Sequence, residues 1–382
     1  MTPFSRRTDW PKNQNPLTTI LEKKRAAGEF ILDLTESNPT RCHFSYANPQ
    51  WLAPLTNPNN LLYEANPKGL LEARQAVARY YASKKILVQP EQIFLTASTS
   101  EAYSFLLRLL CDAGDKIAVS RPGYPLFDYL AALNDVDLLS YRLNYENGWR
   151  LDEKSLSEAF KQNPKALAIV HPHNPTGHQI QDSEKNQIES LCRQNGAALI
   201  SDEVFLDYSE GETFSFAGAN QALTFTVSGI SKILGFPQMK LSWIVVSGPK
   251  ILAEEAGERL EIIADTYLSV NTPSQRALSE WLAQAPAVQK EIWARICANR
   301  KHLEISVKNH PTLKSLVAPA GWYAILATGL RDERAAIDLL TLKNTLVHPG
   351  YFFDFEEDDL LVLSLLPETS VFKQGLEDIL LI

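Results

Sequence analysis

The feature that most constrains the fold is an alternation of short apolar runs with amphipathic stretches between about residues 90 and 248. Strand–helix alternation of this kind builds a parallel sheet whose two faces are covered by helices. After residue 248 long helical stretches dominate and few strands are expected, which is typical of an α+β unit. The expected strands are Ile93–Thr96, Lys116–Ser120, Ala166–Val170, Ala197–Ser201, Leu223–Val227 and Ser242–Val246, with short later strands near Trp322–Leu326 and Leu360–Leu363.

Apolar residues at helical spacing predict the helices between and after these strands. An earlier helix is expected to begin at Asn15-Pro16, since Asn caps helices and Pro suits their first turn. We therefore predict an α/β fold with an N-terminal arm and helix (1–30), a large α/β domain (45–248) and a small α+β domain (31–44 and 249–382). The expected helices are Glu101–Cys111, Ser183–Gln194, Ile251–Tyr267, Ser274–Gln284 and Gln289–Asn309.

Charge and cysteine content narrow the classes of partner. There are 37 Lys and Arg residues against 45 Asp and Glu, a net charge of −8, which argues against nucleic acid or an anionic membrane as the main partner. No apolar run approaches the ~20 residues that span a bilayer. The four cysteines are scattered and fit neither a zinc site nor a disulfide framework. We expect a cytoplasmic protein without a metal.

Polar side chains follow four of the predicted strands. In an open parallel sheet, ligands bind beyond the carboxyl ends of the strands. Ser98, Thr99 and Ser100 follow one strand and open a helix, where hydroxyls and free backbone N–H groups can bind a phosphate. Three further strands are followed by the turn that carries Asn174, by Asp202 and by Ser231-Lys232, so we expect these side chains to converge.

Each of these residues also has a purely structural explanation. Ser and Thr commonly cap helices, Asp commonly caps turns, and most lysines are solvated surface charges. Four independent structural explanations account poorly for the whole group, because successive strand ends carry a phosphate cradle, an amide, a carboxylate and an amine. The group as a whole predicts a site with a nucleophilic lysine.

Five segments in this order resemble the aspartate aminotransferase superfamily, the class I and II aminotransferases of pyridoxal-phosphate fold type I. The resemblance runs from about Leu32 to the C-terminus and implies that fold, pyridoxal 5'-phosphate as cofactor, and an amino donor and a keto-acid acceptor as substrates. The matching segments are Tyr63 with Gly69, Leu71 and Arg74; Pro122-Gly123-Tyr124-Pro125; His173-Asn174-Pro175-Thr176-Gly177; Ser201-Asp202-Glu203-Val204; and Ser231-Lys232.

The resemblance implies a role for each site residue. Lys232 is implied to be the catalytic lysine, which holds the cofactor as a Schiff base and shuttles the substrate proton. Asp202 is implied to pair with the pyridine nitrogen, and Asn174 with the phenolic oxygen of the ring. Tyr124 is implied to stack on the ring, the alternative being a core aromatic. The implied phosphate ligands are Ser98, Thr99, Ser100 and Lys240, with Tyr63 reaching the partner subunit's phosphate in a homodimer.

Four positions depart from the family pattern. Phe205 stands where the family usually has a Tyr that bonds the phenolic oxygen, and Gly229 where it has a phosphate-binding Ser. Lys240 replaces a phosphate-binding Arg, which keeps the charge but loses the bidentate geometry. Val362 stands where an Arg binds the substrate carboxylate. The usual carboxylate clamp is therefore missing.

The loop from Thr35 to Arg41 is the expected replacement for that clamp. By resemblance it passes over the substrate, so Arg41, Ser37 and Asn38 are the predicted substrate-binding residues, with Arg41 as the carboxylate ligand. The alternatives are that Arg41 is a surface residue or an anchor of the N-terminal loop, that His348 or Ser37 binds the carboxylate, or that the substrate is an amine without one.

We predict an aminotransferase. A lyase or decarboxylase that uses the same cofactor on the same fold is the first alternative, because fold alone does not fix the reaction. A cofactor-binding sensor is the second alternative, although residues 1–30 are too short for a DNA-binding domain.

Overall fold

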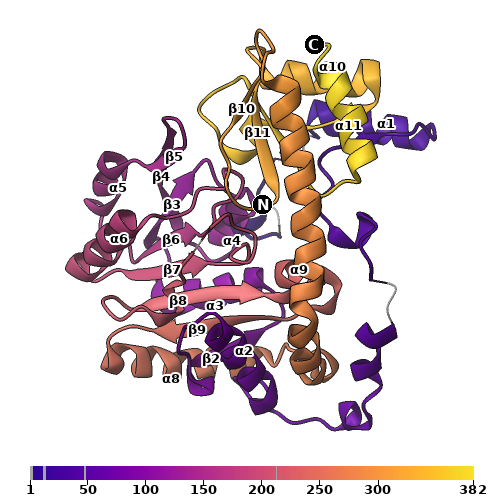
Figure 1. The fold of residues 1–382 in the computed structure, drawn as a ribbon. Coiled ribbons are helices and arrows are strands. Elements are labelled where there is room, and N and C mark those ends of the chain that lie inside the picture. The colour runs from indigo at the N-terminus through magenta and orange to yellow at the C-terminus, as the bar shows by residue number, and fades with distance from the viewer. Residues whose placement is uncertain (1–2, 12–13, 47–48, 212) are drawn as a thin grey trace.

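An eight-stranded sheet forms the centre of the larger part of the chain (Figure 1). The computed structural model describes residues 3–11, 14–46, 49–211 and 213–382. The strand order is β2-β9-β8-β7-β6-β3-β4-β5. The strands are β2 (Ile93–Thr96), β3 (Lys116–Arg121), β4 (Asp137–Tyr145), β5 (Trp149–Leu151), β6 (Ala166–Val170), β7 (Ala198–Asp202), β8 (Thr224–Gly229) and β9 (Ser242–Ser247).

Strand direction in this sheet is mainly parallel, as expected. β4, β3, β6, β7 and β8 pair in parallel, whereas β9 is antiparallel to both of its neighbours, β8 and β2, and β5 is antiparallel to β4. All six strands predicted here are confirmed to within two residues. The strands that carry Thr96, Val170, Asp202 and Gly229 at their ends run in the same direction, so these residues reach the same edge of the sheet.

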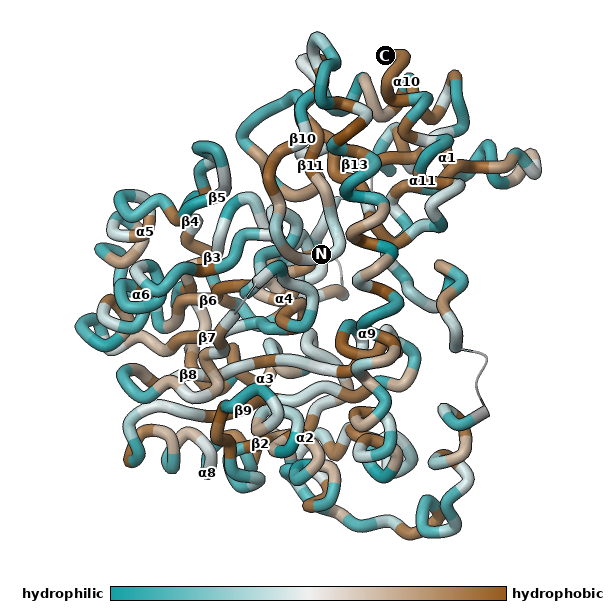
Figure 2. Tube along the Cα trace, viewed as in Figure 1, coloured by the Kyte–Doolittle hydropathy of each residue, from teal (hydrophilic) through white to brown (hydrophobic). Residues whose placement is uncertain are grey.

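Helices cover both faces of the sheet, which confirms the prediction of a three-layer arrangement. One face packs against α3 (Thr99–Leu110), α4 (Leu126–Leu133) and α8 (Lys250–Tyr267). The other packs against α2 (Leu71–Ser83), α5 (Glu153–Phe160) and α6 (Asp182–Asn195). Figure 2 shows apolar residues concentrated along the strands and polar residues on the outer helices, the pattern produced when one stripe of each helix is buried.

A four-stranded antiparallel sheet lies beyond the large one. Its order is β10 (Lys314–Leu316), β11 (Tyr323–Ala327), β14 (Leu360–Ser364) and β13 (His348–Pro349). β1 (Leu32–Asp33) pairs in parallel with β12 (Thr345–Leu346), which ties the N-terminal segment to this region. Two helices, α10 (Asp332–Lys343) and α11 (Thr369–Ile379), accompany these strands. The two later strands expected from the sequence are confirmed as β11 and β14, and the division into domains stays a prediction.

One helix, α9 (Thr272–Val307), replaces the two helices expected over Ser274–Gln284 and Gln289–Asn309. That expectation was wrong because Pro286 lies inside a continuous helix, although Pro usually breaks one. Buried residues on both sides of it, Trp281 and Ile292, belong to the same core, so tertiary packing outweighs the lost hydrogen bond. α9 runs from the large sheet to the small one (Figure 1).

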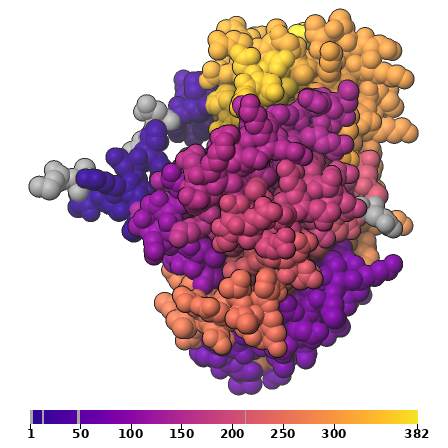
Figure 3. Space-filling model, turned by 90° about the vertical axis from the view of Figure 1, so that its left-hand side faces the viewer, coloured from indigo at the N-terminus to yellow at the C-terminus, as the bar shows by residue number. Residues whose placement is uncertain are grey.

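The N-terminal segment lies on the outside of the molecule and projects from one side in Figure 3. α1 (Pro16–Ala26) begins as predicted, with the Asn15 side chain accepting a hydrogen bond from the Leu17 N–H at 2.8 Å. Arg7 donates a hydrogen bond to Asp135 at 2.6 Å, just beyond α4. Residues 1–2 and 12–13 of the predicted arm lie outside the described residues. Among the helices described, none is long and apolar enough to cross a membrane.

Candidate active site

A cavity of about 170 Å³ lies at the edge of the large sheet where the four strands end. It brings together six of the predicted site residues. Thr99, Asn174, Asp202 and Lys232 come from the strand ends, and the other two are Tyr124 and Ser37, which lies in the loop after β1. Seven further residues complete its lining, namely Tyr103, Phe127, Val170, Val204, Phe205, Ser231 and Tyr323. The convergence predicted from strand order is therefore present in the structure.

Lys232 stands in α7 (Ile230–Ile233), the short helix that follows β8. Its Nζ lies 4.8 Å from the ring centroid of Trp322 and 5.6 Å from that of Phe205. Burial among these rings lowers the pKa of Lys232 to about 8, although the charge of Asp202 acts in the opposite direction. An amine of this kind is partly neutral near physiological pH and can act as a nucleophile or a base. The alternative that Lys232 is a solvated surface charge is wrong.

Asp202 is the last residue of β7 and is buried. Its Oδ2 accepts a hydrogen bond from the Tyr103 hydroxyl at 2.9 Å, and its Oδ1 accepts one from the Val204 N–H at 3.1 Å. Burial raises the pKa of Asp202 to about 6, while the two donors and Lys232 lower it. Asp202 thus caps a turn and also faces the cavity, so both explanations of this residue hold.

Asn174 is positioned by a turn that the structure holds in place on two sides. His173 forms hydrogen bonds with Ser120 at 2.9 Å and with Thr176 at 2.8 Å. Gly177 closes the turn at φ +66°, where a Cβ would lie 2.4 Å from the Ala320 carbonyl oxygen. The Asn174 side chain itself is buried, and its Oδ1 has no hydrogen-bond partner among the described residues. Its amide is therefore available to a ligand in the cavity.

The start of α3 forms one end of the cavity. Ser98 is the N-cap, and its Oγ accepts a hydrogen bond from the Glu101 N–H at 3.1 Å. Ser98 and Ser100 are partly buried but are not among the lining residues, whereas Thr99 is. The capping explanation thus holds for Ser98. The helix N-terminus still presents free backbone N–H groups and a hydroxyl to an anion.

Aromatic side chains form the walls. Tyr124 lines the cavity and is 46% exposed, so the alternative of a core aromatic is wrong. Phe205 is buried and packs edge-on against Trp322, with ring centroids 5.4 Å apart. Burial raises the pKa of Tyr323, while a hydrogen bond with Ser37 lowers it. An aromatic enclosure of this kind accommodates a flat ring and limits the access of water.

These residues fit pyridoxal phosphate, the cofactor that the sequence resemblance implies. The cofactor needs an amine for its aldehyde, a carboxylate for its ring nitrogen, an amide N–H donor for its phenolic oxygen and a helix N-terminus for its phosphate. Lys232, Asp202, Asn174 and Thr99 supply them around one cavity.

Besides Ser98 and Ser100, four predicted residues lie outside the cavity lining, namely Lys240, Asn38, Arg41 and Tyr63. Lys240 is exposed and has a left-handed backbone conformation at φ +49°. Asn38 accepts hydrogen bonds at its Oδ1 from the Thr40 N–H and hydroxyl, at 3.1 and 2.7 Å. The Arg41 side chain is 74% exposed and lies 3.8 Å from Glu36. Their predicted roles stay predictions.

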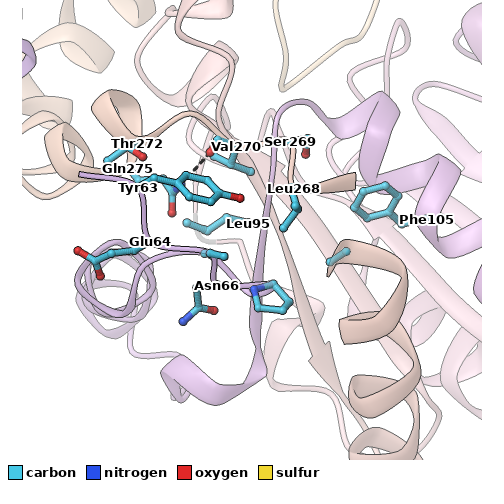
Figure 4. A pocket seen from close by; sticks show the side chains of 14 residues that line it. Tyr63, Glu64, Asn66, Leu95, Phe105, Leu268, Ser269, Val270, Thr272 and Gln275 are labelled. Carbon is cyan, nitrogen blue, oxygen red and sulfur yellow. Dashed lines mark hydrogen bonds between the residues drawn. The ribbon is translucent and has the colours of Figure 1, made fainter. Parts of the chain in front are cut away.

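Tyr63 is exposed and lines a second hollow, which shares no lining residue with the cavity around Lys232. Figure 4 shows its ring lying over Leu95, beside Val270 and Gln275. In this hollow the Gln275 side chain donates a hydrogen bond to the Val270 carbonyl at 3.0 Å. Tyr63 thus does not line the cavity that holds Lys232 in its own chain.

Val362 is fully buried in β14, opposite Ile325 and His348. His348 is not among the residues that line the cavity, and burial lowers its pKa to about 4. Of the residues that do line it, Lys232 is the only cation. Neither Val362 nor His348 therefore supplies a positive charge to a substrate carboxylate here.

Sequence reasoning missed the two hydroxyl-bearing cavity residues Tyr103 and Tyr323. Tyr103 was identifiable in principle, because it follows Thr99 by four residues and so lies on the same face of α3. Tyr323 comes from β11, and no local pattern connects it with the strand ends of the large sheet.

Comparison with known proteins assigns the family. The chain matches the family described as aminotransferase class I and II over residues 50–361. It is 24% identical over 361 residues to the glutamate-pyruvate aminotransferase AlaA of Haemophilus influenzae, covering 91% of this chain and 89% of that protein. It is 27% identical over 317 residues to an alanine aminotransferase of Mycobacterium tuberculosis, covering 79% and 74%.

Solved structures agree on the fold. The alanine aminotransferase from Pyrococcus furiosus superposes with a TM-score of 0.90 at 20% identity, covering 98% of each chain. An aminotransferase from Escherichia coli superposes with a TM-score of 0.89 at 22% identity, covering 100% of this chain and 98% of the other. The fold is that of the type I pyridoxal-phosphate enzymes, and the chain belongs to the class I and II aminotransferases, which use pyridoxal phosphate.

Proposed function

We propose that Lys232 is the residue that binds the cofactor covalently and moves the substrate proton during amino transfer. The observation that carries this proposal is that Lys232, Asp202, Asn174 and Thr99 line one cavity, with the pKa of Lys232 lowered to about 8. Pyridoxal phosphate supplies an aldehyde that takes up the amino group and a ring that withdraws electrons from the substrate carbon.

The residues around Lys232 have complementary tasks. Asp202 keeps a proton on the ring nitrogen, since a buried carboxylate favours a cation beside it. Asn174 orients the ring through its phenolic oxygen, and Thr99 with the α3 N-terminus binds the phosphate. Once released by the substrate, Lys232 would take the proton from the substrate carbon as a neutral amine and deliver it to the former aldehyde carbon of the cofactor, C4′.

Borohydride reduction tests this assignment. Reducing the cofactor-loaded protein and mapping the modified peptide should identify Lys232, and Lys232→Ala should abolish amino transfer and the absorbance of the lysine-bound cofactor. Lys240→Ala is the matched control, because Lys240 is exposed eight residues further along the chain. Modification of Lys240 or another lysine would overturn the assignment.

The substrates are an amino acid and a keto acid. We propose alanine with a 2-oxo acid acceptor as the first pair to assay, because similar relatives are named alanine and glutamate-pyruvate aminotransferases. A lyase would release ammonia and regenerate the aldehyde form of the cofactor, whereas transamination leaves the amine form. Following the cofactor spectrum with the donor alone therefore separates the two reactions.

For the substrate carboxylate we propose Ser37 and Arg41, from the loop that approaches the cavity. Ser37 lines the cavity, and Arg41 follows it by four residues. The Arg41 guanidinium has one ion-pair partner in the described chain, Glu36 at 3.8 Å, so little holds it in its present place. Asn38 is proposed to fix this turn through its bonds to Thr40.

We propose a homodimer with Tyr63 reaching the phosphate of the partner's cofactor. The support is the exposure of Tyr63, Leu61 and Leu268, which are 73%, 91% and 51% exposed on one chain, since large apolar groups gathered at a surface commonly mark an interface. Light scattering should give twice the 42.8 kDa chain mass. We also propose a cytoplasmic location, with support from four cysteines that form no disulfide.

A further inference from the structure

Ser242, the first residue of β9, lies between two segments that build the cofactor site. It pairs with Thr96 at the end of β2 on one side and with Gly229 at the end of β8 on the other. Because β9 is antiparallel to both strands, its first residue reaches the edge where they end. Thr96 leads into the start of α3, and Gly229 leads into the helix of Lys232.

The Ser242 side chain points to the face of the sheet that α3 covers. Side chains alternate between the faces of a strand, and Ile244 and Val246, the next residues in step with Ser242, pack in the same cluster as the α3 residues. The position opposite, Gly229, has an extended backbone, so its backbone does not require glycine. A Cβ at Gly229 would lie 2.2 Å from the Ser242 Oγ. The Ser242 hydroxyl thus occupies the space of a side chain at residue 229.

Ser242 is only 2% exposed, and its hydroxyl forms no hydrogen bond with a protein group of the described chain. The hydroxyl oxygen is not fully enclosed by protein, so it can donate a hydrogen bond to a ligand at this edge of the sheet. Of the two residues paired with Ser242, Thr96 leads within three residues into the start of α3, where an anion is favoured.

We propose that Ser242 donates a hydrogen bond to the phosphate of pyridoxal phosphate and replaces the hydroxyl that Gly229 lacks. The inference rests on the cofactor site proposed above, with the phosphate at the α3 N-terminus. An O–H donor to a charged phosphate oxygen forms a short, strong hydrogen bond. Compared with the family pattern, the hydroxyl comes from the neighbouring strand β9 instead of β8, and Gly229 leaves room for it.

Binding of two forms of the cofactor tests this role without measuring activity. Cofactor-free protein is titrated with pyridoxal phosphate and with pyridoxal, which has no phosphate, and the dissociation constants are read from absorbance or fluorescence. Ser242→Ala should raise the dissociation constant of pyridoxal phosphate by ~10-fold or more, which is the effect of losing one hydrogen bond to a charged group. The dissociation constant of pyridoxal should stay the same. Ser247→Ala is the matched control, at the far end of the same strand and equally buried; it should change neither constant.

Two outcomes would overturn the proposal. One is an unchanged constant for pyridoxal phosphate in Ser242→Ala, and the other is an equal loss for both ligands. If wild-type protein binds pyridoxal phosphate no more tightly than pyridoxal, the phosphate site itself is wrong, which is a different failure.

A reciprocal exchange gives an independent check. Gly229→Ser alone should weaken the binding of pyridoxal phosphate or destabilise the fold, because the new Cβ clashes with the Ser242 side chain. The double variant Gly229→Ser, Ser242→Gly returns the hydroxyl to β8 with room for it, and it should bind pyridoxal phosphate more tightly than Ser242→Ala does. A double variant that binds no better than Ser242→Ala would contradict the exchange.

Discussion

Replacing Tyr103 by Phe should raise the pKa of Asp202 and weaken the interaction of this carboxylate with the pyridine nitrogen of the cofactor. The Tyr103 hydroxyl is the side-chain donor to Asp202 Oδ2, at 2.9 Å, while the Val204 N–H serves Oδ1. A hydrogen bond to a charged group contributes ~1.5–3 kcal/mol, which corresponds to ~1–2 pH units. Since burial already raises the pKa of Asp202 to about 6, the variant should hold a protonated Asp202 near neutral pH.

The titration is measured on cofactor-free protein labelled with ¹³C at the Asp carboxyl carbons, with Asp202→Asn to assign the signal. Tyr141→Phe is the matched control, because Tyr141 is also buried but its hydroxyl donates to the Ala168 carbonyl at 3.2 Å. Cofactor affinity near pH 7 should fall in Tyr103→Phe and not in the control. The reasoning is refuted if Asp202 titrates at the same pH in wild type and in both variants.

Three further predictions follow from the same cavity. Phe205→Tyr should lower the pH at which the lysine-bound cofactor loses its proton, because a new donor favours the ionised phenolic oxygen; an unchanged spectrophotometric titration would count against the placement of the ring. Arg41→Ala should raise the apparent dissociation constant for amino acids by ~10–100-fold with cofactor binding intact; equal affinities would direct attention to amines without a carboxylate. In cofactor-free protein, burial raises the pKa of Asp202 to about 6 from an ordinary 3.8. The protonated carboxyl therefore adds up to ~3 kcal/mol to the free energy of unfolding below pH ~4, and this contribution is lost as the pH rises to ~6. Denaturant unfolding of the wild type should show this loss, and unfolding of Asp202→Asn should not.

The central strands were predictable because a strand buried on both faces is a short, nearly continuous apolar run. β4 gave no such signal, since buried residues alternate with exposed ones along it and its sequence begins with Asp137 and contains Arg142. The single helix α9 was not predictable from local sequence either. Pro286 is a local breaking signal, and only the core that both halves share overrides it.

The site was predictable as far as it depends on strand ends. Asn174, Asp202 and Lys232 need only the positions of β6, β7 and β8 to be placed together. Ser37 was expected through the family resemblance alone, and Tyr323 was not expected, because each reaches the cavity from a segment that long-range packing brings there.

Strand direction explains why Ser242 was not among the predicted ligands. If β9 were parallel to β8, its first residue would lie at the edge opposite Lys232, and only residues after Ser247 would be candidates. A parallel crossover, however, needs about a dozen or more residues and usually a full helix, and the connection over residues 230–241 holds only the four-residue helix α7 and a 3₁₀ turn. A connection without a full helix favours an antiparallel β9. The residue that begins an antiparallel strand lies beside the residue that ends its neighbour, so Ser242 is as much a candidate ligand as the residues that follow β8.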